Sequence, residues 1–147
     1  MSFENLVNEK KIEAVEKEEF SSEAAEKDLK SANNSFNAED YDWAITIAYN
    51  AVLRASRSFM QSLGYRSIGK EHHKNVFEFL REANFNLELS DYFDNIRKQR
   101  NSFVYGIAEG SSKEQAEEVL SKAEDFVHKI RTKQKQTLNT QTKAKQP

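Results

Sequence analysis

One edge of a predicted helix near residue 100 carries side chains that could bind a phosphate group. In the segment 91–106, Arg97, Asn101 and Tyr105 follow one another at i, i+4 and i+8, which places them along one helical edge. Arg100 lies beside them, at the centre of an apolar face. A guanidinium there keeps its charge, so it needs a carboxylate, a carbonyl, water or a bound anion. Two interpretations stay open, an arginine that is paired within the fold and an arginine that binds an anion or takes part in catalysis. The other residues of that face are Phe93, Ile96, Phe103 and Val104.

Three further side chains could extend this candidate phosphate or RNA site. Arg54 lies among apolar positions of an earlier helix, and an ion pair with a carboxylate is its alternative role. His72 and His73 stand at the predicted start of a helix, where backbone N–H groups favour anions, and helix capping or loop packing is their alternative role. Metal-ligand spacing such as His-Glu-x-x-His is absent from the sequence, as are a Gly-rich phosphate loop and a Ser-His-Asp pattern. We therefore expect neither a metal nor a cofactor.

Five helices with short connections are predicted to position these side chains. Gly64 suits a helix C-cap, and Ser111 or Ser112 has Glu114 or Gln115 three residues on, which is typical of a capping box at a helix start. Antiparallel helices with such short loops pack most simply as an up-down bundle. We therefore predict an all-α fold, four long helices with a shorter third one alongside. The predicted helices cover approximately 1–36, 40–63, 72–83, 91–106 and 112–131.

Composition agrees with a small helical domain. The chain has 147 residues, of which 37% are hydrophobic, and its ten Phe and one Trp can supply a core. Only four Gly and one Pro, with 31% charged residues, leave few turn signals. With no Cys, the sequence excludes disulfides and thiolate chemistry. Since no apolar run approaches ~18 residues and nothing resembles a signal peptide, we expect a cytoplasmic protein that does not contact membranes.

Charge is distributed unevenly although the net charge is only −2. Residues 1–20 are rich in Glu and are predicted to form an acidic helical extension. Residues 21–131 are predicted to form the helical bundle. Nothing after Asp125 is acidic, and residues 132–147 lack apolar periodicity, so we predict a disordered basic tail.

Three segments in their order and spacing resemble the HEPN domain, a small α-helical family, over about residues 22–131. The resemblance implies a homodimer. In many members, an arginine, usually followed by a polar residue, and a histidine after four to six intervening positions form a metal-independent endoribonuclease site at the dimer groove. Many are toxins encoded beside a minimal nucleotidyltransferase antitoxin, and others are defence proteins or noncatalytic binding modules. The matching segments are DYDWAITIAYNAVLRASRSFMQSLGYR, GKEHHKNVFEFL and IRKQRNSFVYG.

Carried over by residue, Arg100 takes the family's arginine position, Asn101 the following polar position, and Tyr105 stands in place of the histidine. RNA cleavage by internal transfer needs a base for the 2′-hydroxyl and an acid for the leaving oxygen, and imidazole serves both roles near neutral pH. A phenol has a reference pKa of about 10 and is a poor base at pH 7. The resemblance therefore implies binding of RNA or nucleotide phosphate with weak or degenerate ribonuclease activity. A noncatalytic module that pairs with a nucleotidyltransferase or another protein is the alternative, and a plain structural bundle with a buried ion pair is a third.

Overall fold

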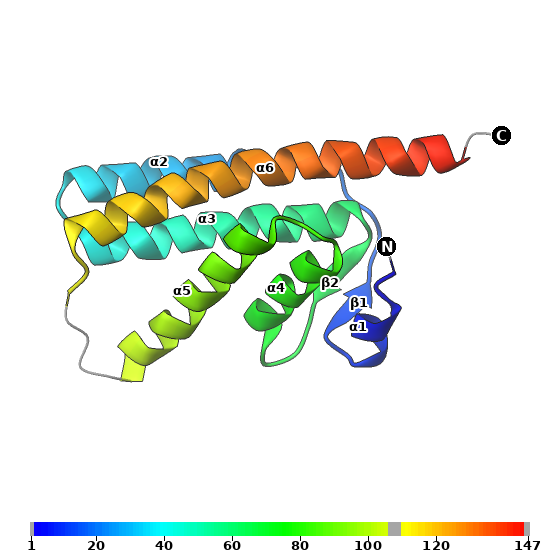
Figure 1. Cartoon of the computed structure of the whole chain (residues 1–147), viewed down its shortest axis with the longest axis horizontal. Helices are drawn as coiled ribbons and strands as arrows, with labels where there is room; N and C mark the ends of the chain where they lie inside the picture. Colours follow the sequence, from blue (N-terminus) through cyan, green and yellow to red (C-terminus); the bar gives the residue numbers. More distant parts are fainter. Residues whose placement is uncertain (1, 106–109, 146–147) are drawn as a thin grey trace.

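The computed structural model describes the backbone of residues 2–105 and 110–145 and the side chains of residues 2–99 and 110–137. Most of this part of the chain is helical, and two short strands pair with each other (Figure 1). In chain order the elements are α1 (Glu4–Asn8), β1 (Ile12–Ala14), α2 (Glu23–Asn37), α3 (Tyr41–Ser62), β2 (Tyr65–Ser67), α4 (His72–Glu82), α5 (Leu87–Tyr105) and α6 (Lys113–Lys145).

Helix α3 is the centre of the fold. It packs against α2, α6, α4 and α5, and α2 also packs against α6. Figure 1 shows α2, α3 and α6 running side by side, with α4 and α5 below α3 and α6. Ala48, Ala51 and Ala55 are fully buried on α3, and their small side chains let neighbouring helices approach closely. The predicted all-α fold, with four long helices and a shorter one, is confirmed.

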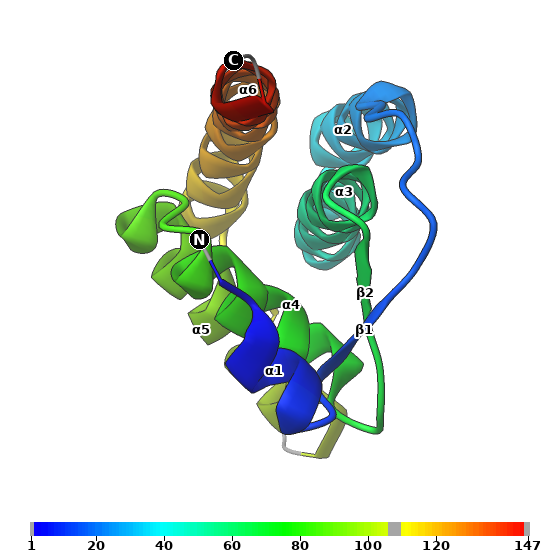
Figure 2. The same cartoon turned by 90° about the vertical axis from the view of Figure 1, so that its right-hand side faces the viewer.

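Aromatic side chains join the α4–α5 hairpin to α6. The ring of Phe126 on α6 lies 5.0 Å from that of Phe85 and 5.6 Å from that of Phe93, centroid to centroid, both edge to face. This geometry suits the quadrupoles of aromatic rings. Figure 2 shows α4 and α5 on the side of α3 that faces away from α2. These phenylalanines, part of the predicted core, therefore hold α5 against α6.

The helix ends follow their local sequence signals. Gly64 follows α3 with a φ of +92°, in the left-handed region that glycine adopts readily. Ser112 and Gln115 form the predicted capping box, since each backbone N–H donates to the other's side chain, at 2.9 and 3.1 Å. Helix α5 begins at Leu87, earlier than predicted, so the break between α4 and α5 is shorter than the segment 84–90. The reason is that Asn86 Oδ1 accepts the N–H of Leu89 at 3.0 Å and caps the helix.

The predicted helix that ends at Phe36 is confirmed from Glu23 onward, as α2. Before that it is wrong, since only the short α1 is helical in residues 2–22. Strand β1 pairs antiparallel with β2, with Ile12 opposite Ser67. The segment that follows β1 donates further backbone hydrogen bonds, from Val15 to the carbonyl of Gly64 at 2.8 Å and from Glu18 to that of Gln61 at 3.1 Å. These distant carbonyls satisfy the backbone in place of a helix, and local sequence does not reveal them.

The predicted disorder of residues 132–147 is also wrong where the structure describes the tail, because α6 continues to Lys145. Gln134 and Thr137 are buried on this extension. Each residue added to an existing helix gains a backbone hydrogen bond at lower entropic cost than the first turn.

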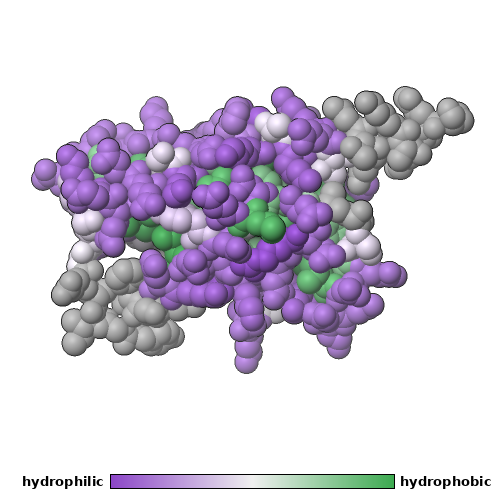
Figure 3. Space-filling view, viewed as in Figure 1, coloured by the Kyte–Doolittle hydropathy of each residue, from purple (hydrophilic) through white to green (hydrophobic). Residues whose placement is uncertain are grey.

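The face of the molecule in Figure 3 is mostly hydrophilic, with hydrophobic residues visible only in small areas between the helices.

Candidate functional site

Helix α5 carries the predicted phosphate-binding edge out of the bundle. Its first half is anchored in the core by Leu89, Phe93 and Ile96, which are buried. Lys98 and Gln99, which follow, are exposed. Figure 1 shows the C-terminal half of α5 running away from α3 and α6. We call Arg97, Arg100, Asn101 and Tyr105 the α5 edge. The backbone of all four residues belongs to α5, whereas the side chains of Arg100, Asn101 and Tyr105 lie outside the described residues.

Arg97 is held in place by a network of charges. Its Nε–H donates to Asp94 Oδ1 at 2.8 Å, and its side chain is only 15% exposed. The other oxygen of Asp94 accepts from Arg81 Nη2 at 2.6 Å, and Arg81 also reaches Asp91 at 2.9 Å. Asp94 itself is 6% exposed. Arg97 is therefore paired within the fold, at the end of the α5 edge that lies nearest the core.

The network is electrostatically balanced. Burial by itself raises the pKa of Asp94, but the hydrogen bonds from Arg81 and then Arg97 outweigh it and hold the pKa below the usual carboxyl value. Burial likewise lowers the pKa of Arg81, but hydrogen bonds to Asp94 and Asp91 raise it above its usual value. Two carboxylates face two guanidiniums, so the network offers no surplus positive charge to a phosphate. Of the four residues of the α5 edge, Arg100 is the remaining cation.

Sequence reasoning missed Arg81, Asp91 and Asp94. The spacing of Asp94 and Arg97 at i, i+3 was a readable signal for an ion pair within the helix. Nothing local indicates the bond from Arg81, which comes from α4 across the hairpin. Only the packing of α4 on α5 brings its guanidinium to Asp94.

Arg54 is paired on another side of α3. Its Nε lies 3.1 Å from Asp28 Oδ2 of α2, and its side chain is 57% exposed. The contact is the ion pair that was the alternative to a role in the positive groove. The structure therefore groups Arg54 with α2 and not with Arg97.

The two histidines begin α4, as predicted. His73 packs near Tyr49 of α3, with ring centroids 6.4 Å apart, and its ring lies 4.3 Å from that of His72. His72 lines a cavity of about 230 Å³ with residues of α3 and β2, and none of the described side chains of α5 contributes to it. The structure thus places His72 in a different cluster, with Arg57 and Arg66.

Comparison with known proteins assigns the chain to a family. The family model described as HEPN domain matches residues 18–133. The chain belongs to the HEPN domain family. A similar protein of Methanocaldococcus jannaschii, named "Putative toxin MJ0142", is 26% identical over 114 residues, which cover 74% of this chain and 76% of the relative. The resemblance carried by the three sequence segments is confirmed at the level of the family.

Tyr65 and Tyr92 of this HEPN chain pack against neighbouring side chains. Tyr65 packs against the rings of Phe3 and Phe79, with centroids 5.2 and 5.9 Å away. Tyr92 is half-buried with Lys122 Nζ 5.1 Å above its ring. Burial first, and then the charge of Glu118, raise the pKa of Tyr92 to about 12, so it stays protonated at neutral pH.

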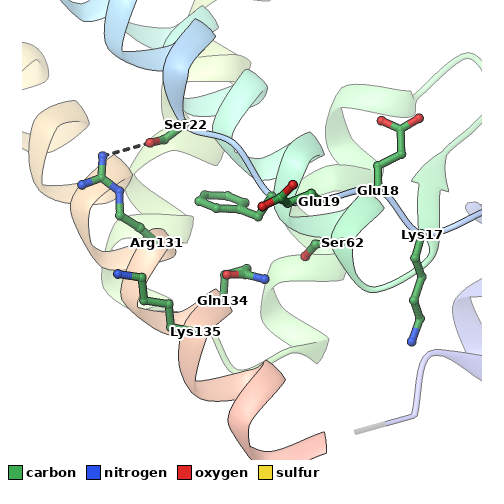
Figure 4. A pocket seen from close by; sticks show the side chains of 9 residues that line it. Lys17, Glu18, Glu19, Ser22, Ser62, Arg131, Gln134 and Lys135 are labelled. Carbon is green, nitrogen blue, oxygen red and sulfur yellow. Dashed lines mark hydrogen bonds between the residues drawn. The ribbon is translucent and has the colours of Figure 1, made fainter. Parts of the chain in front are cut away.

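A larger cavity of about 570 Å³ lies between the segment after β1, the end of α3 and α6 (Figure 4). Its lining carries both signs of charge, with Lys17 and Lys135 beside Glu18 and Glu19. Figure 4 shows Arg131 directed at Ser22, to which its Nη2 donates at 2.9 Å. This mixed lining does not select an anion.

The described residues include no group of three or more His, Cys, Asp or Glu side chains that could hold a metal ion. Within residues 2–105 and 110–145, none of the helices has the length and apolar character needed to cross a membrane.

Proposed function

We propose that this HEPN-family chain acts in the cytoplasm as a toxin-like two-fold homodimer that binds RNA or nucleotide phosphate along the α5 edge. Membership of the family and the relative named as a toxin support a toxin-like role. The observation that carries the proposal is the anchoring of α5, whose first half is locked into the core while its second half leaves the bundle. A rigid base under a projecting helix suits a site that two copies complete together.

Three residues of the α5 edge have separate roles in this proposal, while Arg97 stays paired with Asp94. Arg100 supplies the charge that binds a phosphate, since a guanidinium can donate two parallel hydrogen bonds to it. Asn101 adds an amide donor, and Tyr105 donates a hydrogen bond from its hydroxyl. Because a phenol is a poor base at neutral pH, we expect any metal-independent endoribonuclease activity to be weak or absent.

A noncatalytic interaction module is the second candidate function. It is favoured by Tyr105, which stands where the family resemblance expects a histidine. In this case the same dimer binds a partner protein, such as a nucleotidyltransferase of the antitoxin type. A nucleotidyltransferase gene beside this one would favour a toxin-antitoxin pair.

Light scattering should detect a dimer of the full chain at tens of micromolar, on the order of ordinary dimer affinities. The expected mass is twice the 17.0 kDa of one chain. The reason is that α5 carries aromatic and aliphatic residues on more than one side, more than one packing seam needs. A mass of one chain at that concentration would contradict the dimer.

Replacing Arg100 with alanine should abolish binding of single-stranded RNA while changing the free energy of unfolding by less than about 1 kcal/mol, as for a surface position. The reason is that a phosphate-binding arginine leaves no buried carboxylate behind when it is removed. Fluorescence anisotropy with labelled RNA measures the first effect, and urea unfolding measures the second. A loss of roughly 3–5 kcal/mol would instead assign Arg100 to a buried ion pair and overturn the binding role.

A further inference from the structure

We propose that the cavity lined by Arg57, Arg66 and His72 is a second binding site, which takes a phosphomonoester group. The cavity has a volume of about 230 Å³, and its lining also includes Met60, Gln61 and Ser67. This site goes beyond the function proposed above, because it needs neither a dimer nor any residue of the α5 edge.

Three elements hold the cavity in a fixed shape. Arg57 and Gln61 belong to the last turns of α3, and Gly64 then turns the chain so that β2 returns beside α3. The start of α4 is tied to β2, because Asn75 Nδ2 donates to the carbonyl of Ile68 at 3.0 Å. Ile68 in turn donates its N–H to the carbonyl of Lys11 at 3.0 Å. The backbone segments that carry the cavity's side chains are therefore held in place before any ligand arrives, which lowers the entropic cost of binding.

The charge of the cavity is positive. Among the residues that the structure describes, its lining contains two arginines and a histidine but no acidic residue. Arg66 shares its charge with Glu13, opposite it on β1, through two close contacts. Arg57 supplies the remaining positive charge.

Arg57 differs from the other arginines whose side chains the structure describes. Those at positions 54, 66, 81, 97 and 131 each form an ion pair with a carboxylate. No described carboxylate or other acceptor contacts the guanidinium of Arg57, although its side chain is half-buried. A partly desolvated charge without a partner is costly, and a bound anion in the cavity would supply the missing acceptors.

The size and the donors of the cavity favour a phosphate group over a whole nucleotide. Pockets that enclose drug-sized ligands measure ~300–1,000 Å³, so this smaller cavity holds a phosphate and its ester carbon while the rest of the ligand extends into solvent. The guanidinium of Arg57 matches a phosphate in geometry, and the Gln61 amide and Ser67 hydroxyl add neutral donors. A phosphomonoester carries a charge of about −1.5 to −2 at pH 7, more than a carboxylate, and so gains more from this lining.

An NMR titration of the ¹⁵N-labelled full chain at low ionic strength tests the proposal with site resolution. Inorganic phosphate and adenosine 5′-monophosphate should both shift the backbone amides of Ser67, Ile68 and His72 in a saturable way, whereas adenosine should not. Equal affinities would identify the phosphate group alone as the ligand, and tighter binding of the nucleotide would identify its phosphomonoester. No saturable shift at these amides with either phosphate would overturn the proposal.

Variants of Arg57 test which side chain binds the phosphate. Arg57→Gln should weaken phosphate binding at these amides about 10-fold or more, since a hydrogen bond to a charged group is lost. Arg57→Lys keeps the charge and should weaken it less. The matched control is Lys70→Gln, which removes an exposed cation from the β2–α4 loop outside the cavity and should change the affinity less than about twofold. Equal losses in Arg57→Gln and Lys70→Gln would show only general attraction by charge and would overturn the site.

The binding role proposed for the α5 edge can be tested separately from this second site. Arg100→Ala should leave the phosphate shifts at Ser67 and His72 unchanged, because the described lining of the cavity comes from α3, β2 and α4. Phosphate shifts confined to the amides of α5 would support the α5 edge and refute the second site.

Discussion

Replacing Asp94 with asparagine should lower the free energy of unfolding at pH 7 by about 3 kcal/mol, the lower end of the cost of removing one partner from a buried ion pair. The carboxylate of Asp94 is 6% exposed and accepts from both Arg81 and Arg97. Asparagine keeps the size of the side chain but leaves the 15% exposed Arg97 without its counter-charge. We expect the lower end because Arg81 is 36% exposed and water replaces part of its lost contact. Urea unfolding of both proteins measures the difference.

Asp91→Asn is the matched control for Asp94→Asn. Asp91 lies one turn earlier on α5 and binds the same Arg81, but its side chain is 60% exposed. Exposed ion pairs contribute about 0–1 kcal/mol, so this variant should lose no more than that. Equal losses in the two variants would contradict the view that Asp94 anchors α5.

The contribution of Asp94 should also depend on pH. Because the folded-state pKa of Asp94 lies below the usual carboxyl value, its contribution is complete above that usual value and is lost as the pH falls through the folded-state pKa. The wild type should therefore lose stability relative to Asp94→Asn as the pH falls from 7 toward the acid range. A constant difference between the two proteins down to low pH would show that Asp94 does not titrate in this way.

Replacing Tyr105 with histidine should raise cleavage of single-stranded RNA by about 10²–10⁴-fold, the usual contribution of general acid–base catalysis. The reason is that imidazole can accept the proton of the 2′-hydroxyl near neutral pH, whereas the phenol cannot. The histidine would stand on the helical stripe that carries Arg97 and Asn101, so the backbone of α5 need not change. Cleavage rates with a chelator present measure the gain and should not depend on added metal.

Two controls accompany Tyr105→His. The double variant with Arg100→Ala should lose the gained activity, because the phosphate is no longer held. Tyr105→Phe should remain as weak as the wild type. Strong wild-type cleavage that is lost on Arg100→Ala and unaffected by Tyr105→Phe would show that the base lies elsewhere, with His72 or His73 as the next residue to test.

The sequence by itself determined the features that depend on neighbours within a few residues. Helical periodicity predicted the all-α fold. Capping chemistry predicted the start of α6 at Ser111 or Ser112, of which Ser112 forms the cap, and the end of α3 near Gly64. The i, i+3 spacing of Asp94 and Arg97 was readable in the same way. These features were accessible because their hydrogen bonds and charges lie within one helical turn or one cap.

Tertiary structure decided what depends on residues far apart in the chain. The acidic N-terminal segment is not one long helix, because Glu13 on β1 pairs with Arg66 on β2 and carbonyls near Gly64 bind the segment that follows. Arg81 reaches Asp94 only because α4 folds back on α5, and His72 joins Arg57 because β2 brings the start of α4 to the end of α3. Local propensity and spacing specify neither contact, since each requires two helices to pack first.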